Sequence, residues 1–220
     1  MPLRNRVLPT GEIVADPGRG LLMGNRGCLH GAGRDLGVAR WRSPAWICCV
    51  TDWRGWRRDP MPPGRWTALF FLDEATALAA GHRPCAYCRR EAFLAYANAL
   101  PATGAHPGTR LAAGGQPGVP AAGHRPYAPE IDRALHAERV DRHTRRQVTR
   151  LVASAALPAA AMVRAGGAVH LVVDGGRMRP WSWAGYGPAA PMPVEVELLT
   201  PPTSVRALAA GYRPVLHPTA

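Results

Sequence analysis

The chain has 220 residues and a formal net charge of +12 at pH 7, and all 27 of its basic residues are arginine. Its length allows one large domain or two small ones around a real hydrophobic core. No stretch approaches the roughly 18 consecutive apolar residues of a membrane-spanning helix, and the N-terminus lacks the apolar core of a signal peptide, so we expect a soluble, cytoplasmic protein with no membrane partner.

The abundance of arginine has two explanations. Arg, Ala, Gly and Pro are all frequent, so mutational bias accounts for part of the charge. Guanidinium groups also match phosphate oxygens in a forked geometry, which favours DNA as a partner. A nucleic-acid-binding surface and a merely solvated arginine surface both stay open, and the sequence does not indicate an oligomeric state.

The N-terminal part predicts a small sheet. Gly24-Asn25-Arg26-Gly27 indicates a turn, because glycine and asparagine adopt turn conformations readily. Residues 45–53 and 67–72 are rich in aromatic and β-branched side chains, which is typical of strands.

Two short helices are expected next. Asp73 is a suitable N-cap and Gly81 a suitable C′ residue, so the alanine-rich stretch between them predicts a short helix. Residues 89–100 predict an amphipathic helix, because their apolar side chains recur at helical spacing. The residues that share its apolar face are Phe93, Tyr96, Ala97 and Leu100.

Residues 101–127 are rich in Gly, Pro and Ala without apolar periodicity, which indicates a flexible linker or insertion. Residues 129–151 predict a helix with Pro129 in its first turn. On that helix Asp132, His136 and either Arg139 or Arg133 lie near one stripe. An enzyme could use His136 and Glu138 as an acid–base pair, but residues two positions apart point about 200° apart on a helix, so we interpret this helix surface as a solvated face. The remaining predicted strands are 167–173, 178–183 and 193–199, the first two joined by a hairpin turn at 174–176.

The end of the chain predicts a degenerate repeat. Residues 204–214 share with residues 75–84 the run Ala-Leu-Ala-Ala-Gly, then an aromatic residue or His, then Arg-Pro. The second copy has Val215 where the first has Cys85, and His217 stands near the place of Cys88. We therefore expect two strand–helix–turn units, with thiols kept in only one.

Five cysteines without an export signal favour metal binding or free thiols over a disulfide framework. Cys85 and Cys88 form a Cys-x-x-Cys pair, which supplies half of a tetrahedral zinc site. Cys48 and Cys49 are adjacent on a predicted strand and point to opposite faces, so only one of them can readily reach a given metal.

The predicted ligand set is His30, Cys49, Cys85 and Cys88, with Zn²⁺ as the ion. Cys28 could replace His30, and Cys48 could replace Cys49. The nearby cations Arg83, Arg89 and Arg90 would favour thiolates and are the predicted nucleic-acid contacts.

One segment of about twenty residues holds an aromatic strand, a helix, a glycine, Arg-Pro and the two cysteines in fixed register. Its matching parts are Phe70-Phe71, Glu74-Ala75, Ala79-Ala80-Gly81, Arg83-Pro84-Cys85 and Cys88. This segment resembles the zinc-binding module of the Ada family of DNA-repair proteins. The resemblance is close over these residues and looser over residues 20–100.

The resemblance implies a small α+β module that holds zinc with four ligands. In Ada itself all four are cysteines, and one of them accepts a methyl group from a DNA phosphotriester. This chain departs from the upstream Cys-x-x-x-Cys of Ada, since it has the adjacent Cys48-Cys49. Other Ada-like modules carry a Gly-Asn turn, a His and a single Cys before the helix, which His30 and Cys49 match.

The expected fold is α+β: a small mixed sheet with short helices around a zinc knuckle in residues 1–100, the linker at 101–127, and a β-rich part in residues 128–220 with the degenerate repeat at 204–217. The predicted function is a zinc-binding protein with a structural Cys3His-type site, associated with nucleic acid. The alternatives are a zinc-thiolate alkyl acceptor in DNA repair, with Cys49 as the acceptor, and a purely structural zinc-stabilised protein. Whether the chain is an enzyme stays open.

Overall fold

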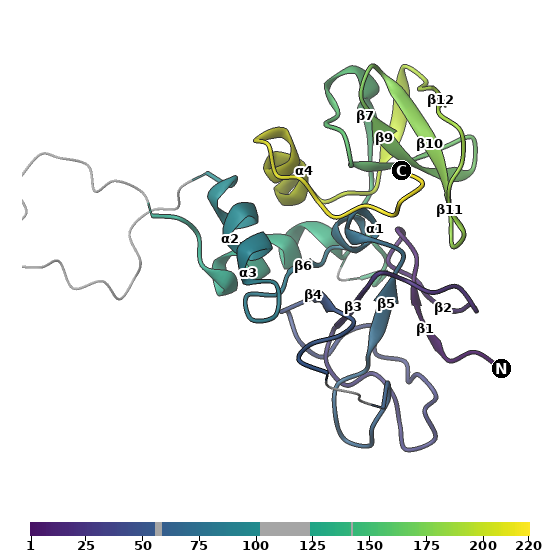
Figure 1. The fold of residues 1–220 in the computed structure, drawn as a ribbon, viewed down its shortest axis with the longest axis vertical. Helices are drawn as coiled ribbons and strands as arrows, with labels where there is room; N and C mark the ends of the chain where they lie inside the picture. The colour runs from purple at the N-terminus through teal and green to yellow at the C-terminus, as the bar shows by residue number, and fades with distance from the viewer. Residues whose placement is uncertain (56–58, 102–123, 142) are drawn as a thin grey trace, which may run out of the picture.

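The computed structural model describes residues 1–55, 59–101, 124–141 and 143–220. Two mostly antiparallel sheets and a few short helices form a mixed α+β fold, which confirms the α+β part of the prediction (Figure 1). Most of the predicted linker lies outside the described residues. Among the described residues, no helix has the length and apolar character needed to cross a membrane.

The N-terminal sheet has six strands in the order β2-β1-β5-β3-β4-β6. Its strands are β1 (Arg4–Val7), β2 (Ile13–Ala15), β3 (Leu22–Asn25), β4 (Ile47–Val50), β5 (Leu69–Phe71) and β6 (Arg83–Pro84). The pairs β1–β5 and β4–β6 are parallel and the others antiparallel, so the sheet is mixed.

The described strand pairs of the C-terminal sheet are all antiparallel, in the order β11-β10-β9-β8-β13-β7 with β12 beside β10. Its strands are β7 (Arg150–Ala153), β8 (Met162–Ala165), β9 (Ala168–Val173), β10 (Arg177–Ser182), β11 (Gly185–Tyr186), β12 (Ala190–Pro191) and β13 (Glu195–Leu198). The predicted hairpin turn lies between β9 and β10, where Gly175 and Gly176 have φ values of 76° and 70°.

Helix α1 (Glu74–Ala79) lies between the two sheets, and all six of its residues are buried (Figure 1). The carboxylate of Asp73 caps it by accepting from the Thr76 N–H at 2.9 Å, as the sequence predicts. Leu78 belongs to the larger core cluster with the C-terminal sheet, whereas Ala77 belongs to the smaller cluster under the N-terminal sheet. Small side chains on this helix let both sheets pack closely against it.

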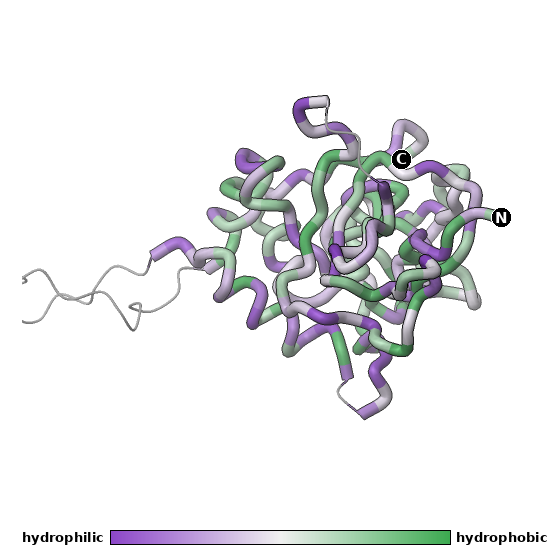
Figure 2. The backbone as a smooth tube through the Cα atoms, turned by 90° about the horizontal axis from the view of Figure 1, so that it is seen from below, coloured by the Kyte–Doolittle hydropathy of each residue, from purple (hydrophilic) through white to green (hydrophobic). Residues whose placement is uncertain are grey.

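Three further helices flank the sheets: α2 (Arg90–Asn98), α3 (Ala128–Arg139) and α4 (Pro202–Ala209). The larger core joins residues from both sides of the linker, for example Phe93 and Tyr96 of α2 with Met162 of β8 and Leu208 of α4. Hydrophilic residues gather on the outlying loops (Figure 2).

The α1 and α4 units end alike. Each is followed by a glycine with positive φ, 82° at Gly81 and 99° at Gly211. The next residue, His82 or Tyr212, donates its N–H to the carbonyl of Ala77 or Ala207 at 2.9 Å. That the two units arose as copies stays a prediction.

Two expectations about secondary structure are wrong. The helix expected over 129–151 ends at Arg139, because Asp141 then forms a turn by accepting from the N–H groups of His143 and Thr144. The turn expected at 24–27 begins later, because Gly24 and Asn25 pair with β4 as part of β3.

Candidate metal centre

Strand β4 places its two cysteines on opposite faces, as expected from strand alternation. Cys48 is fully buried in the core under the N-terminal sheet. Burial raises the pKa of its thiol, and the guanidinium of Arg89 donates to its sulfur at 2.9 Å. Cys49 points the other way, toward the segment that carries Cys85 and Cys88.

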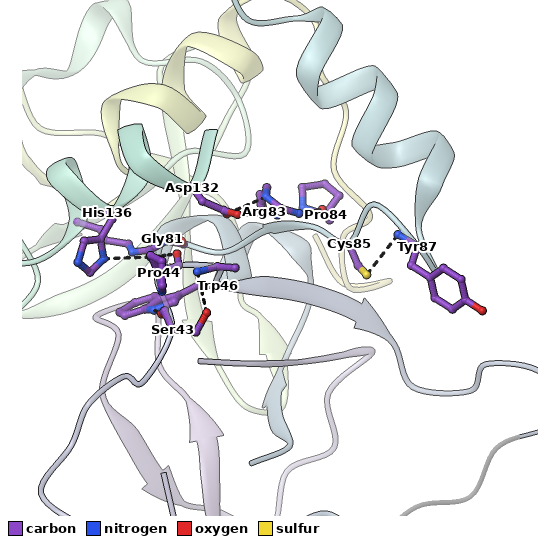
Figure 3. A network of polar contacts seen from close by, with 12 residues as sticks. Ser43, Pro44, Trp46, Gly81, Arg83, Pro84, Cys85, Tyr87, Asp132 and His136 are labelled. Atoms are coloured by element: carbon purple, nitrogen blue, oxygen red, sulfur yellow. Dashed lines mark hydrogen bonds and ion pairs between the residues drawn. The ribbon is translucent and has the colours of Figure 1, made fainter. Parts of the chain in front are cut away.

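Backbone pairing brings the Cys-x-x-Cys segment to Cys49. β6 runs parallel to β4, with Cys48 opposite Pro84, and the Cys85 N–H donates to the Cys48 carbonyl at 2.9 Å. The chain then turns, and the Tyr87 N–H donates to the Cys85 sulfur at 3.4 Å (Figure 3). This turn delivers Cys88 to the same place, directly before α2.

The three sulfurs of Cys49, Cys85 and Cys88 all lie within 4.8 Å of one another. Zinc with Zn–S bonds of ~2.3 Å requires tetrahedrally placed sulfurs ~3.8 Å apart, so this spacing fits a three-thiolate site. The pKa of Cys85 is lowered because Cys49, Cys88 and backbone N–H groups donate to its sulfur. The pKa of Cys49 is raised by its hydrogen bonds with Cys85 and Cys88 and by burial. A divalent ion at this point would displace the shared protons and hold all three as thiolates.

The structure does not bring His30 to this cluster. Its Nε2 lies 3.1 Å from the Pro62 carbonyl and its Nδ1 lies 2.6 Å from the Thr67 hydroxyl. Because a carbonyl only accepts, Nε2 donates to Pro62, and Nδ1 shares a hydrogen bond with the Thr67 hydroxyl. Both nitrogens of this buried ring therefore have protein partners.

The two alternative ligands also lie elsewhere. Cys28 donates weakly to the His30 carbonyl at 3.7 Å. Cys48 lies in the core on the far face of β4. Among the described residues, only Cys49, Cys85 and Cys88 form such a metal-ligand group.

Two of the three arginines expected at nucleic acid are buried in ion pairs. Arg83 donates to both oxygens of Asp132 at 2.9 and 2.8 Å, which ties β6 to α3 (Figure 3). Arg89 donates to both oxygens of Glu74 at 2.8 and 2.7 Å. Only Arg90 is exposed. The stripe expected to be a solvated face is therefore partly interior, because Asp132 is also buried.

A cavity of about 290 Å³ adjoins the three thiols. Its walls include Trp53, Trp66, Phe70 and Tyr87, and the rings of Trp53 and Tyr87 are 5.4 Å apart. The sequence did not predict this aromatic wall, because its residues are spread over two loops and a strand. One sequence signal was the density of tryptophan at Trp53, Trp56 and Trp66.

Comparisons with models of protein families, with curated proteins and with solved structures found no match for this chain. Its function is therefore inferred from the geometry of the site itself.

Proposed function

We propose that this protein binds one Zn²⁺ ion through the thiolates of Cys49, Cys85 and Cys88, and that the ion ties β4 to the start of α2. The observation that carries the proposal is the convergence of three sulfurs from two separate segments within 4.8 Å. Three sulfur donors select zinc among the common divalent ions. The three cysteines line the aromatic cavity, so water or a bound molecule in it would supply the fourth ligand.

The proposed centre resembles that of an Ada-like module in its Cys-x-x-Cys pair and in the single upstream cysteine that supplies the third sulfur. The proposed centre differs from the predicted Cys3His set, because His30 is held by Thr67 and Pro62. Alkyl transfer to Cys49 stays a prediction that rests on the resemblance alone.

Metal analysis of the purified full chain tests the zinc proposal. We expect about one zinc per chain, and we expect Cys85→Ser to weaken zinc binding by more than about 100-fold, since even changes outside the ligand shell cost 10–100-fold. Cys28→Ser is the matched control, because this thiol lies outside the cluster. Competition with a coloured zinc chelator measures both. Protein that takes up no zinc, or equal losses in the two variants, would rule the centre out.

We also propose that the protein associates with nucleic acid through its exposed arginines. The support is the net charge of +12 and the exposure of Arg90 beside the proposed centre. Arg83 and Arg89 are assigned to the interior instead, since each is paired with a buried carboxylate.

Filter binding of a short DNA duplex over a range of salt concentrations tests this association. We expect retention at low salt and a steep loss as salt rises, because phosphate contacts release counterions. Arg90→Gln should reduce the slope of log affinity against log salt by about 1. Absence of any retention at low salt would contradict the proposal and leave the zinc centre untouched.

A further inference from the structure

A second cavity, of about 420 Å³, lies on the side of α1 where the end of α3 meets both sheets, and it shares no lining residue with the thiol centre. Six arginines line it and only two carboxylates do. The arginines are Arg26, Arg40, Arg139, Arg145, Arg146 and Arg164, and the carboxylates are Glu12 and Glu197. We call this cavity the arginine cleft.

Two of these arginines are buried against one tryptophan. Arg26 is 2% exposed and Arg139 is 1% exposed. Their guanidinium carbons lie 4.0 and 3.9 Å from the ring centroid of Trp46, so two cations contact the same indole. Figure 3 shows Trp46 beside Pro44 and Gly81, the residues whose carbonyls accept from Arg139 at 2.6 and 2.7 Å.

Neither buried guanidinium has an ion pair with any described carboxylate. Arg26 donates to the Gly11 carbonyl at 2.9 Å and to His82 Nε2 at 3.3 Å, and its Nη2 has no partner among the described residues. Two other buried atoms also lack a hydrogen-bond partner among the described residues: the Nε of Arg139 and the Oε1 of Gln147, which lines the cleft as well.

Such an arrangement favours a bound anion. Burying a cation without a counter-ion is costly, and carbonyls compensate only part of the lost hydration. Burial and the neighbouring Arg139 and Arg40 lower the pKa of Arg26 to about 9, and burial lowers the pKa of Arg139 to about 9. Both groups stay protonated at neutral pH, so the cleft floor carries two positive charges that no described carboxylate pairs with directly.

The rim supplies groups that can reach a ligand directly. Arg40, Arg145 and Arg146 are exposed and line the cleft. Arg145 has a positive φ of 56°, an unfavourable conformation for a residue with a side chain. Arg164, by contrast, is neutralised by Glu197 at 2.7 Å. Trp41 forms part of the wall and is only half-buried.

We propose that the arginine cleft binds a phosphate-bearing ligand of nucleotide size: a nucleoside phosphate, either free or at the end of a nucleic-acid strand. Forked guanidinium groups bind phosphate oxygens in pairs, and the cleft volume lies in the range of small-molecule sites. Trp41 lines the cleft and is only half-buried, so its ring provides an aromatic surface on which a base can stack. The strand-end form rests on the nucleic-acid association proposed above, whereas the free-nucleotide form does not.

Titration calorimetry on the full chain at low salt tests the phosphate requirement with AMP, ATP, pyrophosphate and adenosine. We expect ATP and AMP to bind at least ten-fold more tightly than adenosine.

The double variant Arg145→Gln/Arg146→Gln should lower ATP affinity at least ten-fold. The matched double variant Arg133→Gln/Arg213→Gln removes the same charge from exposed positions outside the cleft, and it should change ATP affinity less than two-fold. Trp41→Ala should weaken AMP binding and leave pyrophosphate binding unchanged.

Oligonucleotides with and without a 5′-phosphate separate the two sources of the ligand. A gain in affinity from the 5′-phosphate that disappears in Arg145→Gln/Arg146→Gln supports a strand end, and nucleotide binding without that gain supports a free nucleotide. Adenosine binding as tightly as ATP, or equal losses in both double variants, would overturn the proposal. Zinc content should be unchanged in every arginine variant, so this result is independent of the metal centre.

Discussion

Replacing Glu74 with glutamine is expected to lower the free energy of unfolding by about 3–5 kcal/mol, the cost of leaving a buried charge without its partner. Glu74 is fully buried and accepts from both terminal nitrogens of Arg89. It also accepts from the Tyr212 hydroxyl at 2.6 Å and the Val215 N–H at 2.8 Å. Glutamine keeps the shape of the side chain, but it removes the negative charge and puts an NH₂ group where an acceptor is needed.

Urea unfolding followed by circular dichroism measures this loss. Glu91→Gln is the matched control, because this carboxylate is exposed on α2 and surface substitutions usually change stability by about 0.5 kcal/mol or less. Adding Arg89→Met to Glu74→Gln should restore part of the stability, since it removes the unpaired cation. A loss below about 1 kcal/mol in Glu74→Gln would show that this ion pair does not stabilise the fold as described.

Asp132→Asn is expected to cost a similar amount, about 3–5 kcal/mol, for the same reason. The Asp132 carboxylate is the partner of Arg83, and both side chains are buried. Its negative charge also supports the protonated form of Arg139, which has no carboxylate of its own in contact. Asparagine would leave two buried guanidinium groups with weaker compensation at the junction of α3 and β6.

The same unfolding experiment tests this expectation, with Asp35→Asn as the control at an exposed position. Hydrogen exchange adds a second measurement, because loss of the ion pair should raise the exchange rate of the α3 amides more than that of the β9 and β10 amides. Unchanged protection of α3 would show that the helix is held by its apolar face, through Ile131 and Leu135, and not by Asp132.

Much of the three-thiol cluster could be predicted from local patterns. The Cys-x-x-Cys spacing identified Cys85 and Cys88, and strand alternation showed that only one of Cys48 and Cys49 could join them. The choice of Cys49 depended on which face of β4 is covered, which is a property of the sheet. His30 was wrong as a member of the cluster, because Thr67 and Pro62, more than thirty positions away, hold both ring nitrogens.

The arginines were harder to place than the thiols. Arg83 and Arg89 precede and follow the cysteine pair, and nothing local distinguishes them from the exposed Arg90. Their burial depends on Glu74 and on Asp132, which is 49 positions from Arg83. A charged residue can enter the core only where a distant partner meets it, so a local pattern predicts a surface.

Secondary structure was predictable where capping and periodicity agreed, as for the helix that Asp73 begins. The strand Arg4–Val7 was missed, because its alternating arginines resemble a charged loop until the sheet shows that Asn5 and Val7 face inward. The end of α3 was missed because the side chain of Asp141 competes for backbone N–H groups that a helix would otherwise use.

The Glu74 side chain links the cysteine turn to the C-terminal end of the chain. Cys88 and Arg89 are consecutive, and the pair formed by Arg89 and Glu74 also fixes Tyr212 and Val215. A change in the Glu74, Arg89 or Tyr212 side chain would leave buried polar groups without partners, which compensating changes at the other two would relieve. Among related sequences, we therefore expect Glu74, Arg89 and Tyr212 to be present or absent together. These three side chains join the cysteine turn to the last strand–helix unit of the chain.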